Sequence, residues 1–411
     1  MRVLIVADNV SARMGGEAVI PLHYLREMRT LGVDAHALTH ARVADEIEVA
    51  PEFDATRTHF IKDTAFERAI NIASKGVPGA IRETLFMNVI GVSTGLRLAR
   101  RARELALQIG ADIIHQPTPV SPAAPSYLTR MPAPVIIGPM NGGMDYPPAF
   151  TRDYSRGSGA IVAAGRASAA LANAIFAGKR DAAALVVANP RTRDALPENV
   201  DRTRARILVE NGVDLEAWGP LRRRATPAAP TFVFVGRLVW WKAVDLLIAA
   251  FEKVEGEARL RIIGDGDERP ALEKIAAASN ASARIRFEGF RPQAEIRDAL
   301  AEAMALVLPS LRECGGAVVL EAFASGAPAI ATDWGGPADY ITPQSGVLVP
   351  PSGRDAFVAG LAEAMNALAR DPARAAIMGA EGRRLVEEKY AWREKARAMI
   401  GIYEEALGKR R

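Results

Sequence analysis

The chain has 411 residues, of which 49% are hydrophobic and 24% are charged. This length is too great for one ordinary hydrophobic core and suits two domains of about 200 residues each. The 52 basic side chains nearly balance the 48 acidic ones, so we expect no nucleic-acid partner. The single cysteine, Cys314, excludes an intramolecular disulfide and a thiolate metal site, and indicates a reducing compartment.

Composition also limits the metal and membrane classes. The five histidines show no HExxH or other paired ligand spacing, so we expect no metal site and no cofactor. The apolar run at residues 3–7 is too short for a signal peptide, and the alanine-rich stretch 159–178 contains Arg166 and favours a packed helix. We therefore expect a cytoplasmic protein.

The N-terminal half shows strands that alternate with helices. Apolar runs predict strands at residues 3–7, 33–38, 112–115 and 135–137, the last followed by a loop at 138–143. Gly15 and Gly16 lie in a loop before a helix that runs to about residue 31 and ends at Gly32. Residues 60–109 are irregular in pattern. Such alternation predicts a parallel sheet with crossover helices.

The C-terminal half repeats this pattern more regularly. Strands are predicted at 231–235, 260–263, 285–288, 305–308 and 329–332, and helices at 244–254, 270–278, 294–303 and 318–324. Residues 220–230 are rich in Pro, Ala and Arg and suit a linker. The fold class is therefore α/β, with a Rossmann-like sheet in each half.

Two cations follow the first strand of the C-terminal half. Gly236 permits a tight turn at the end of that strand, and Arg237 and Lys242 project from the loop beyond it. Ligands bind at this edge of open α/β sheets. The alternative is that an isolated pair of this kind is simply solvated.

A glycine pair opens a helix later in the same half. Gly315 and Gly316 come after the strand at 305–308 and before the helix at 318–324, so free backbone N–H groups there can face an anion. A helix N-terminus contributes about 0.3–1 kcal/mol. A cation 4 Å from a phosphate has a Coulomb term of about 4 kcal/mol at an effective dielectric of 20. We therefore expect Arg237 and Lys242 to contribute most to diphosphate binding.

Two acids flank the glycine pair. Glu313 and Glu321 have carboxylates that can each accept two hydroxyl hydrogen bonds, which suits a sugar and a ribose. Alternatively, Glu313 caps the helix and Glu321 pairs with a buried arginine. Glu321 stands in the apolar run 318–323, where an unpaired acid is costly, and this favours a functional role.

Together these residues resemble retaining glycosyltransferases of family 4, which have the GT-B architecture of two Rossmann-like domains with parallel sheets facing across a cleft. The resemblance rests on Gly236, Arg237 and Lys242, and on Glu313 with Glu321 eight positions later. Further matches occur at residues 211–214, 264–266, 287–290, 322–328 and 390–393. It implies an N-terminal acceptor-binding domain at 1–206, a donor-binding domain at 207–386, and a C-terminal helix at 387–411 that crosses back onto the first domain.

The resemblance also assigns roles in the C-terminal half. Arg237 and Lys242 would bind the donor diphosphate, Glu321 the ribose, and Glu313 with the backbone of Gly315 and Gly316 the transferred sugar. Glu313, Arg237 and Lys242 would thus be catalytic. Phe290 and Arg291 stand where the nucleotide base docks in this family.

In the N-terminal half, Gly15 and Gly16 resemble the family's glycine loop near the donor phosphates. His115 stands at the first position of the family's His-x-His stretch and would be catalytic, although a histidine that ends a buried strand is often structural. Asn141 and Gly142 would contact the acceptor, and a plain turn is the alternative.

The sequence departs from the family at three points. Gly315 replaces an aromatic residue, Ala243 replaces a glycine, and the second histidine of the His-x-His stretch is missing. None of these changes removes a charge from the predicted diphosphate site.

The implied reaction transfers a hexose-type sugar from a UDP- or GDP-sugar to a glycan, glycolipid or small-molecule acceptor, with retention at the anomeric carbon and without a metal. Two alternatives stay open: a nucleotide-sugar epimerase on the same fold, and a non-catalytic nucleotide-sugar binding subunit. The arginines at 97–103, with Arg152, Arg156 and Arg166, would contact an anionic membrane surface or form a solvated helix face. The sequence does not indicate an oligomeric state.

Overall fold

A computed structural model describes residues 1–47, 54–74, 86, 88–151, 168–220 and 229–408. Arg152, Arg156, Arg166 and most of the expected linker at 220–230 lie outside these residues. The chain splits into two compact units. The first consists of Met1–Gly143, Ala160–Glu210 and Lys395–Arg411, and the second of Met144–Gly159 and Asn211–Glu394. In the described part of the chain, no helix is long and apolar enough to cross a membrane.

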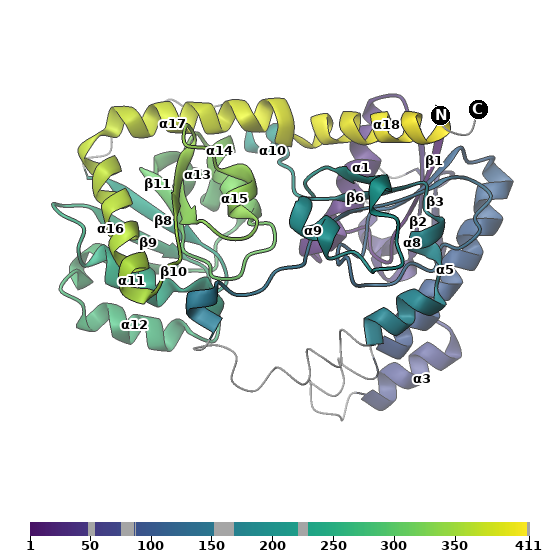
Figure 1. Cartoon of the computed structure of the whole chain (residues 1–411), viewed down its shortest axis with the longest axis horizontal. Helices are drawn as coiled ribbons and strands as arrows, with labels where there is room; N and C mark the ends of the chain where they lie inside the picture. The colour runs from purple at the N-terminus through teal and green to yellow at the C-terminus, as the bar shows by residue number, and fades with distance from the viewer. Residues whose placement is uncertain (48–53, 75–85, 87, 152–167, 221–228, 409–411) are drawn as a thin grey trace. The chain divides into compact units, whose positions relative to one another are not determined.

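The first unit contains a seven-stranded parallel sheet with the order β3-β2-β1-β4-β5-β6-β7 (Figure 1). Its strands are β1 (Arg2–Val6), β2 (Asp34–His40), β3 (Thr58–Ile61), β4 (Ile113–Gln116), β5 (Val135–Met140), β6 (Ala184–Val187) and β7 (Ala205–Ile207). The four strands predicted here are confirmed. Because the strand order reverses between β1 and β4, the carboxyl ends of these two strands form a topological switch point, where such sheets bind ligands.

One prediction for this sheet was wrong at its end. The expected loop at 138–143 begins later, because β5 continues through Gly138 and Pro139 to Met140. The pairing with β6 shifts register between Ile137 and Met140, and a Cβ at Gly138 would lie 2.1 Å from the Val186 carbonyl oxygen. Glycine therefore permits the close approach of these two strands.

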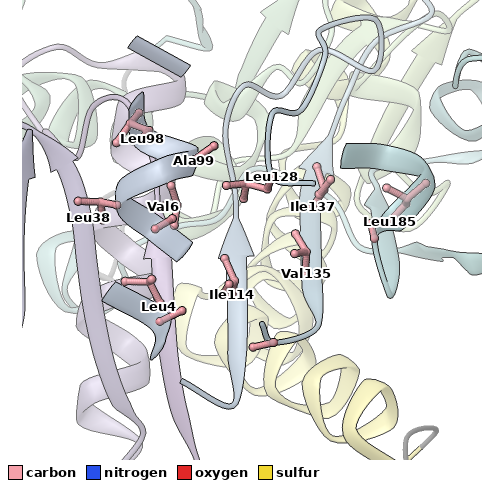
Figure 2. Packing of buried hydrophobic residues seen from close by; sticks show 14 of the residues in the cluster. Leu4, Val6, Leu38, Leu98, Ala99, Ile114, Leu128, Val135, Ile137 and Leu185 are labelled. Carbon is pink, nitrogen blue, oxygen red and sulfur yellow. The ribbon is translucent and has the colours of Figure 1, made fainter. Parts of the chain in front are cut away.

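Helices cover the sheet of the first unit. Their bounds are α1 (Val19–Thr30), α2 (Ala44–Ile47), α3 (Ala65–Ala73), α5 (Asn88–Ile109), α8 (Gly178–Asp181) and α9 (Pro190–Asp194). Helix α5 confirms that the arginines at 97–103 lie on a helix. Figure 2 shows the buried cluster that α5 forms with one face of the sheet, where Leu4 and Val6 of β1 meet Leu98 and Ala99. Alternate residues of β1 point to the same face, so Leu4 and Val6 pack together.

The second unit contains a six-stranded parallel sheet with the order β10-β9-β8-β11-β12-β13 (Figure 1). Its strands are β8 (Thr231–Val235), β9 (Arg259–Ile263), β10 (Ile285–Gly289), β11 (Ala305–Leu308), β12 (Ala329–Thr332) and β13 (Gly346–Val349). All five predicted strands are confirmed. The switch point of this sheet lies between β8 and β11, so the loops that follow these two strands are neighbours.

The helices of the second half begin with α10 (Leu215–Trp218), α11 (Val244–Phe251), α12 (Arg269–Ala278), α13 (Gln293–Glu302), α14 (Ala317–Ala324) and α15 (Pro337–Tyr340). They continue with α16 (Arg354–Arg370), α17 (Pro372–Leu385) and α18 (Trp392–Gly408). Helix α11 packs against α16, and α14 against α17. The chain passes from the second unit into the first within α18, where Lys395 begins the last segment of the first unit.

Candidate functional site

The loop after β8 is held by backbone bonds to its neighbour. Gly236 N–H donates to the Ile263 carbonyl at 3.0 Å, and Leu238 N–H donates to the Asp265 carbonyl at 2.8 Å. A Cβ at Gly264 would lie 1.9 Å from the Gly236 carbonyl oxygen, so only glycine fits there. This close packing fixes the course of the loop from which Arg237 and Lys242 project.

The loops after β8 and β11 meet at the switch point of the second sheet. Leu311 N–H donates to the Trp241 carbonyl at 2.9 Å, which ties one loop to the other. As a result the Lys242 ammonium forms an ion pair with the Glu313 carboxylate. Each of these side chains is only about 15% exposed, so the pair is shielded from solvent.

Arg237 takes no part in this ion pair. Its side chain is exposed, and its guanidinium lies 5.9 Å from the ring centroid of Trp241 in a cation–π contact. The aromatic ring therefore holds Arg237 near Lys242, which follows Trp241 in the sequence.

Gly316 begins helix α14 in a left-handed conformation with a φ of 69°. A Cβ there would lie 3.2 Å from the Glu313 Cγ, so glycine also leaves room for that side chain. Gly336 N–H donates to the Glu313 carbonyl at 2.8 Å and fixes the backbone of the acid. Gly315 is buried in the same turn. The glycines thus place Glu313 at the start of α14.

Glu321 lies on α14. Its carboxylate has no hydrogen-bond or ion-pair partner among the described residues, so the arginine partner that we considered is not found there. Burial raises the pKa of Glu321 to about 7. Trp218 Nε1 donates to the Glu321 carbonyl at 3.0 Å and anchors the helix. A partly buried, unpaired carboxylate of this kind is typical of a ligand site.

Phe290 and Arg291 follow β10. Phe290 is 81% exposed, and such an exposed ring can stack on a nucleotide base. Arg291 Nη1 instead donates to Glu295 at 3.3 Å, while Arg261 holds the nearby Glu288 at 2.7 Å. Phe290 is therefore the more available of the two.

His115, which the resemblance would make catalytic, lies in the interior of the first unit. Its side chain is completely buried in the first unit. Nε2 donates to the Gly138 carbonyl at 2.7 Å, and Nδ1 accepts from the Tyr403 hydroxyl at 2.7 Å. Burial lowers the pKa of His115 to about 4, although the bond to Gly138 acts in the opposite direction. Both ring nitrogens are in use and the side chain has no exposed surface, which favours the structural alternative for His115.

Asn141 and Gly142 are held by α9. The Thr192 hydroxyl donates to Asn141 Oδ1 at 3.3 Å, and Gly142 N–H donates to the same hydroxyl at 3.1 Å. Asn141 is 5% exposed, and Gly142 packs against Pro122. These contacts fix both residues within the first unit. Of the two, only Gly142 is partly exposed.

Gly15 and Gly16 also belong to the first unit. Both have positive φ angles, 63° and 54°, which explains the need for glycine just before α1. The loop ahead of them is fixed by Glu46, which accepts from Ala12 N–H at 2.7 Å and Arg13 N–H at 3.0 Å.

An aromatic cluster beside Lys242 was not predicted. Tyr146 stacks on Trp240 with ring centroids 5.2 Å apart, and Trp240 meets Trp241 edge to face at 5.4 Å. The Arg312 guanidinium lies 5.5 Å from the Tyr146 centroid. In the sequence, the adjacent tryptophans just before Lys242 could have indicated this cluster. Tyr146 comes from a distant segment, so its position could not be predicted in this way. We call Tyr146, Trp240, Trp241, Arg237 and Arg312 the aromatic–arginine cluster.

Residues 223–384, which carry the ion pair and both flanking acids, match the family model described as "Glycosyl transferases group 1". These residues are a group 1 glycosyl transferase domain. The match covers less than half of the chain and falls in the second half, where the sequence resemblance is strongest. The matched residues include Arg237, Lys242, Glu313 and Glu321.

Relatives of the group 1 domain match over similar ranges. An alpha-maltose-1-phosphate synthase from Mycolicibacterium smegmatis is 31% identical over 215 residues, which cover 48% of this chain and 56% of that protein. A glycogen synthase from Mycobacterium tuberculosis is 31% identical over 229 residues, with 54% of each chain covered. The chain thus spans about half the length of the curated relatives that it matches.

The whole chain has a solved counterpart in fold. It matches sucrose-phosphate synthase from Thermosynechococcus elongatus with a TM-score of 0.69 over 99% of both chains, at 20% identity. This likeness shows that the fold is GT-B, as the sequence predicted.

Proposed function

We propose that this protein is a retaining glycosyltransferase of family 4 that moves a hexose-type sugar from a UDP- or GDP-sugar to a hydroxyl acceptor. The Lys242–Glu313 ion pair at the switch point of the second sheet is the observation that carries the proposal. It places a shielded cation and a carboxylate side by side, as a sugar diphosphate requires. The group 1 domain match supports the same donor class.

The chemistry assigned to each residue follows from its charge and setting. Lys242 and Arg237 neutralise the diphosphate, which becomes more negative as the glycosidic bond breaks. Glu313 and the Gly315–Gly316 backbone hold the sugar hydroxyls, and Glu321 accepts hydrogen bonds from the ribose. Phe290 stacks on the base.

Retention is proposed to arise from a front-face exchange. The acceptor hydroxyl approaches from the side that the diphosphate leaves, and the departing phosphate oxygen takes its proton. Catalysis then comes chiefly from positioning and from neutralising the leaving group. We propose no metal cofactor, because Lys242 and Arg237 supply the positive charge, and chelation with EDTA should leave transfer unchanged.

The remaining elements of the proposal concern the whole chain. Residues 1–206 would bind the acceptor, residues 207–386 the donor, and residues 387–411 would pack on the first domain. The relatives' names, a glycogen synthase among them, support a role in polysaccharide biosynthesis. We propose a glycan, glycolipid or small-molecule acceptor. We propose a cytoplasmic location.

A product analysis tests the function. The full chain is incubated with a panel of UDP- and GDP-sugars, with and without alcohol and sugar acceptors, and the products are examined by mass spectrometry and NMR. We expect an acceptor-dependent product whose anomeric configuration matches that of the donor. An isomerised nucleotide-sugar formed without acceptor would identify an epimerase, and binding without any product would identify a binding subunit.

A further inference from the structure

The first unit contains a cavity of about 720 Å³ at the switch point of its own sheet. Ala7 and Asp8 line it just beyond the end of β1, and Gln116 lines it at the end of β4. Because β1 and β4 pair in parallel, these carboxyl ends lie side by side. The cavity therefore occupies the position where open α/β sheets bind ligands, and its volume is typical of a small-molecule site, which is about 300–1,000 Å³.

The described lining is mostly apolar and carries a single charged side chain. Leu98 and Val92 of α5, Leu128, and Ala169 and Ala172 of the helical residues 168–175 contribute most of its apolar character. Among the described residues that line the cavity, Asp8 is the one charged side chain, and none is a lysine, arginine or histidine. Burial raises the pKa of Asp8 and the positive charge of Arg42 acts in the opposite direction, but Arg42 is not among the described residues that line the cavity. From these described residues a phosphate group would meet a carboxylate and no cation.

Two polar groups in the cavity make no hydrogen bond within the described part of the chain. Neither the Asp8 carboxylate nor the Tyr127 hydroxyl makes a hydrogen bond with another described residue. Both residues line the same cavity. Burial raises the pKa of Tyr127, and the charge of Asp8 raises it further. Both can bind a ligand hydroxyl: the carboxylate accepts its proton in a hydrogen bond, and the phenol can donate to its oxygen.

The position of Tyr127 is built into the fold. A Cβ at Gly95 of α5 would lie 2.4 Å from the Tyr127 ring, so glycine leaves room for the ring against that helix. On its other side, Tyr127 meets Phe176 edge to face, with centroids 4.6 Å apart. The ring is therefore fixed at the cavity wall with its hydroxyl available.

We propose that this cavity binds the acceptor, and that the acceptor is an uncharged alcohol with an apolar alkyl or aryl body. The apolar wall holds the body, and Asp8 with Tyr127 binds the hydroxyl that receives the sugar. The acceptor role rests on the proposed function, whereas binding of the alcohol does not. Phosphorylated sugars are disfavoured, because the described residues that line the cavity supply a carboxylate and no cation.

Binding of a homologous series of probes tests the proposal. Primary alcohols from butanol to dodecanol, and 2-naphthol, are titrated against the full chain by calorimetry or ligand-observed NMR, with glucose 6-phosphate as the anionic probe. Each added methylene should raise the affinity about four-fold until the cavity is full. Equal affinities along the series, or tighter binding of glucose 6-phosphate, would overturn the proposal.

Two substitutions on one helical segment locate the site. Ala172 lines the cavity, whereas Ala170 is exposed and does not line it. Ala172→Phe should weaken binding of the longest soluble alcohol at least ten-fold, and Ala170→Phe should leave it unchanged. Asp8→Asn should weaken alcohol binding several-fold by removing the charged acceptor. Equal effects of the two phenylalanine variants would contradict the assignment.

Binding of UDP and GDP, measured on the same preparations, separates this proposal from the proposed function. Ala172→Phe should bind nucleotide like the unmodified chain, which also shows that it is folded. Alcohol binding that follows these predictions in a chain that binds no nucleotide would uphold the cavity and overturn the donor site. Nucleotide binding without alcohol binding would uphold the donor site and overturn the proposal for the cavity.

Discussion

The ammonium of Lys242 and the carboxylate of Glu313 form an ion pair across 71 residues of sequence. The pairing of β8 with β11 brings their loops together, and each partner neutralises the other in the absence of ligand. A diphosphate must therefore compete with Glu313 for Lys242. Because of this competition, replacing Lys242 and replacing Glu313 should have different effects on donor binding.

Replacing Glu313 should have opposite effects on donor binding and on transfer. Glu313→Gln removes the competing charge, so UDP or GDP should bind as tightly as before or more tightly. Transfer should fall at least 100-fold, because the sugar hydroxyls lose their charged acceptor. Calorimetry and initial rates measure the two effects. A matched loss of binding and transfer would show that Glu313 does not act on the sugar.

Glu321 should make donor binding pH-dependent. Burial raises its pKa to about 7, and ribose hydroxyls bind the ionised form. Below pH 7 the carboxyl must lose a proton before it accepts these hydrogen bonds, so nucleotide affinity should fall by up to ten-fold per pH unit. Above pH 7 it should be constant. Glu321→Gln should lack this component, which separates it from titration of the phosphates. An unchanged pH profile in that variant would contradict the ribose role.

Ala243 should be a source of strain. Its φ of 51° lies in the left-handed region. The resemblance to family 4 implies a glycine at this position. Ala243→Gly should therefore stabilise the chain by about 0.5–1 kcal/mol, since relief of strain outweighs the added entropy of the unfolded state. Urea unfolding measures the change. Ala250→Gly within α11 is the control and should destabilise by at least about 1 kcal/mol.

The His115 site should affect stability and leave the chemical step intact. His115→Ala removes the hydrogen bonds of the buried imidazole to the Gly138 carbonyl and the Tyr403 hydroxyl, which should cost about 2–4 kcal/mol in the free energy of unfolding. Transfer per folded molecule should stay within a few-fold of the unmodified value. Tyr403→Phe removes one of the two bonds and should cost less. A 100-fold loss of transfer in folded His115→Ala would restore a catalytic role.

The same histidine sets a pH dependence of stability. Burial lowers its pKa in the folded chain to about 4, below the ordinary value of 6.5. The unfolded chain therefore binds a proton that the folded chain does not, and stability falls as pH drops from 6.5 toward 4. Above pH 6.5 the contribution is complete. His115→Gln should reduce this slope in acid unfolding curves.

The sequence predicted the second sheet better than the first. Strands such as β8, β11 and β12 are continuous apolar runs with clear glycine or proline borders, and their predicted bounds were correct. The short strand β3 is only partly buried, and β7 has three residues. Such strands are defined by their neighbours, so no local pattern marked them.

The sequence also predicted only part of the candidate site. The charges of Lys242 and Glu313 were visible as a motif, but the burial that raises the pKa of Glu321 depends on helix packing. The role of His115 depends on Tyr403, which lies 288 residues later on α18. Contacts at such separation follow from tertiary structure alone.

Nucleotide affinity of a matched pair of lysine variants tests the central claim most directly. Lys242 faces Glu313 at the proposed diphosphate site, whereas Lys253 is exposed at the far end of α11. Titration of UDP and GDP should show an affinity loss of about 100-fold for Lys242→Ala, the cation–phosphate term after part of it is offset by desolvation. Lys253→Ala should bind like the unmodified chain. Affinities within two-fold for both variants would contradict a diphosphate site at Lys242.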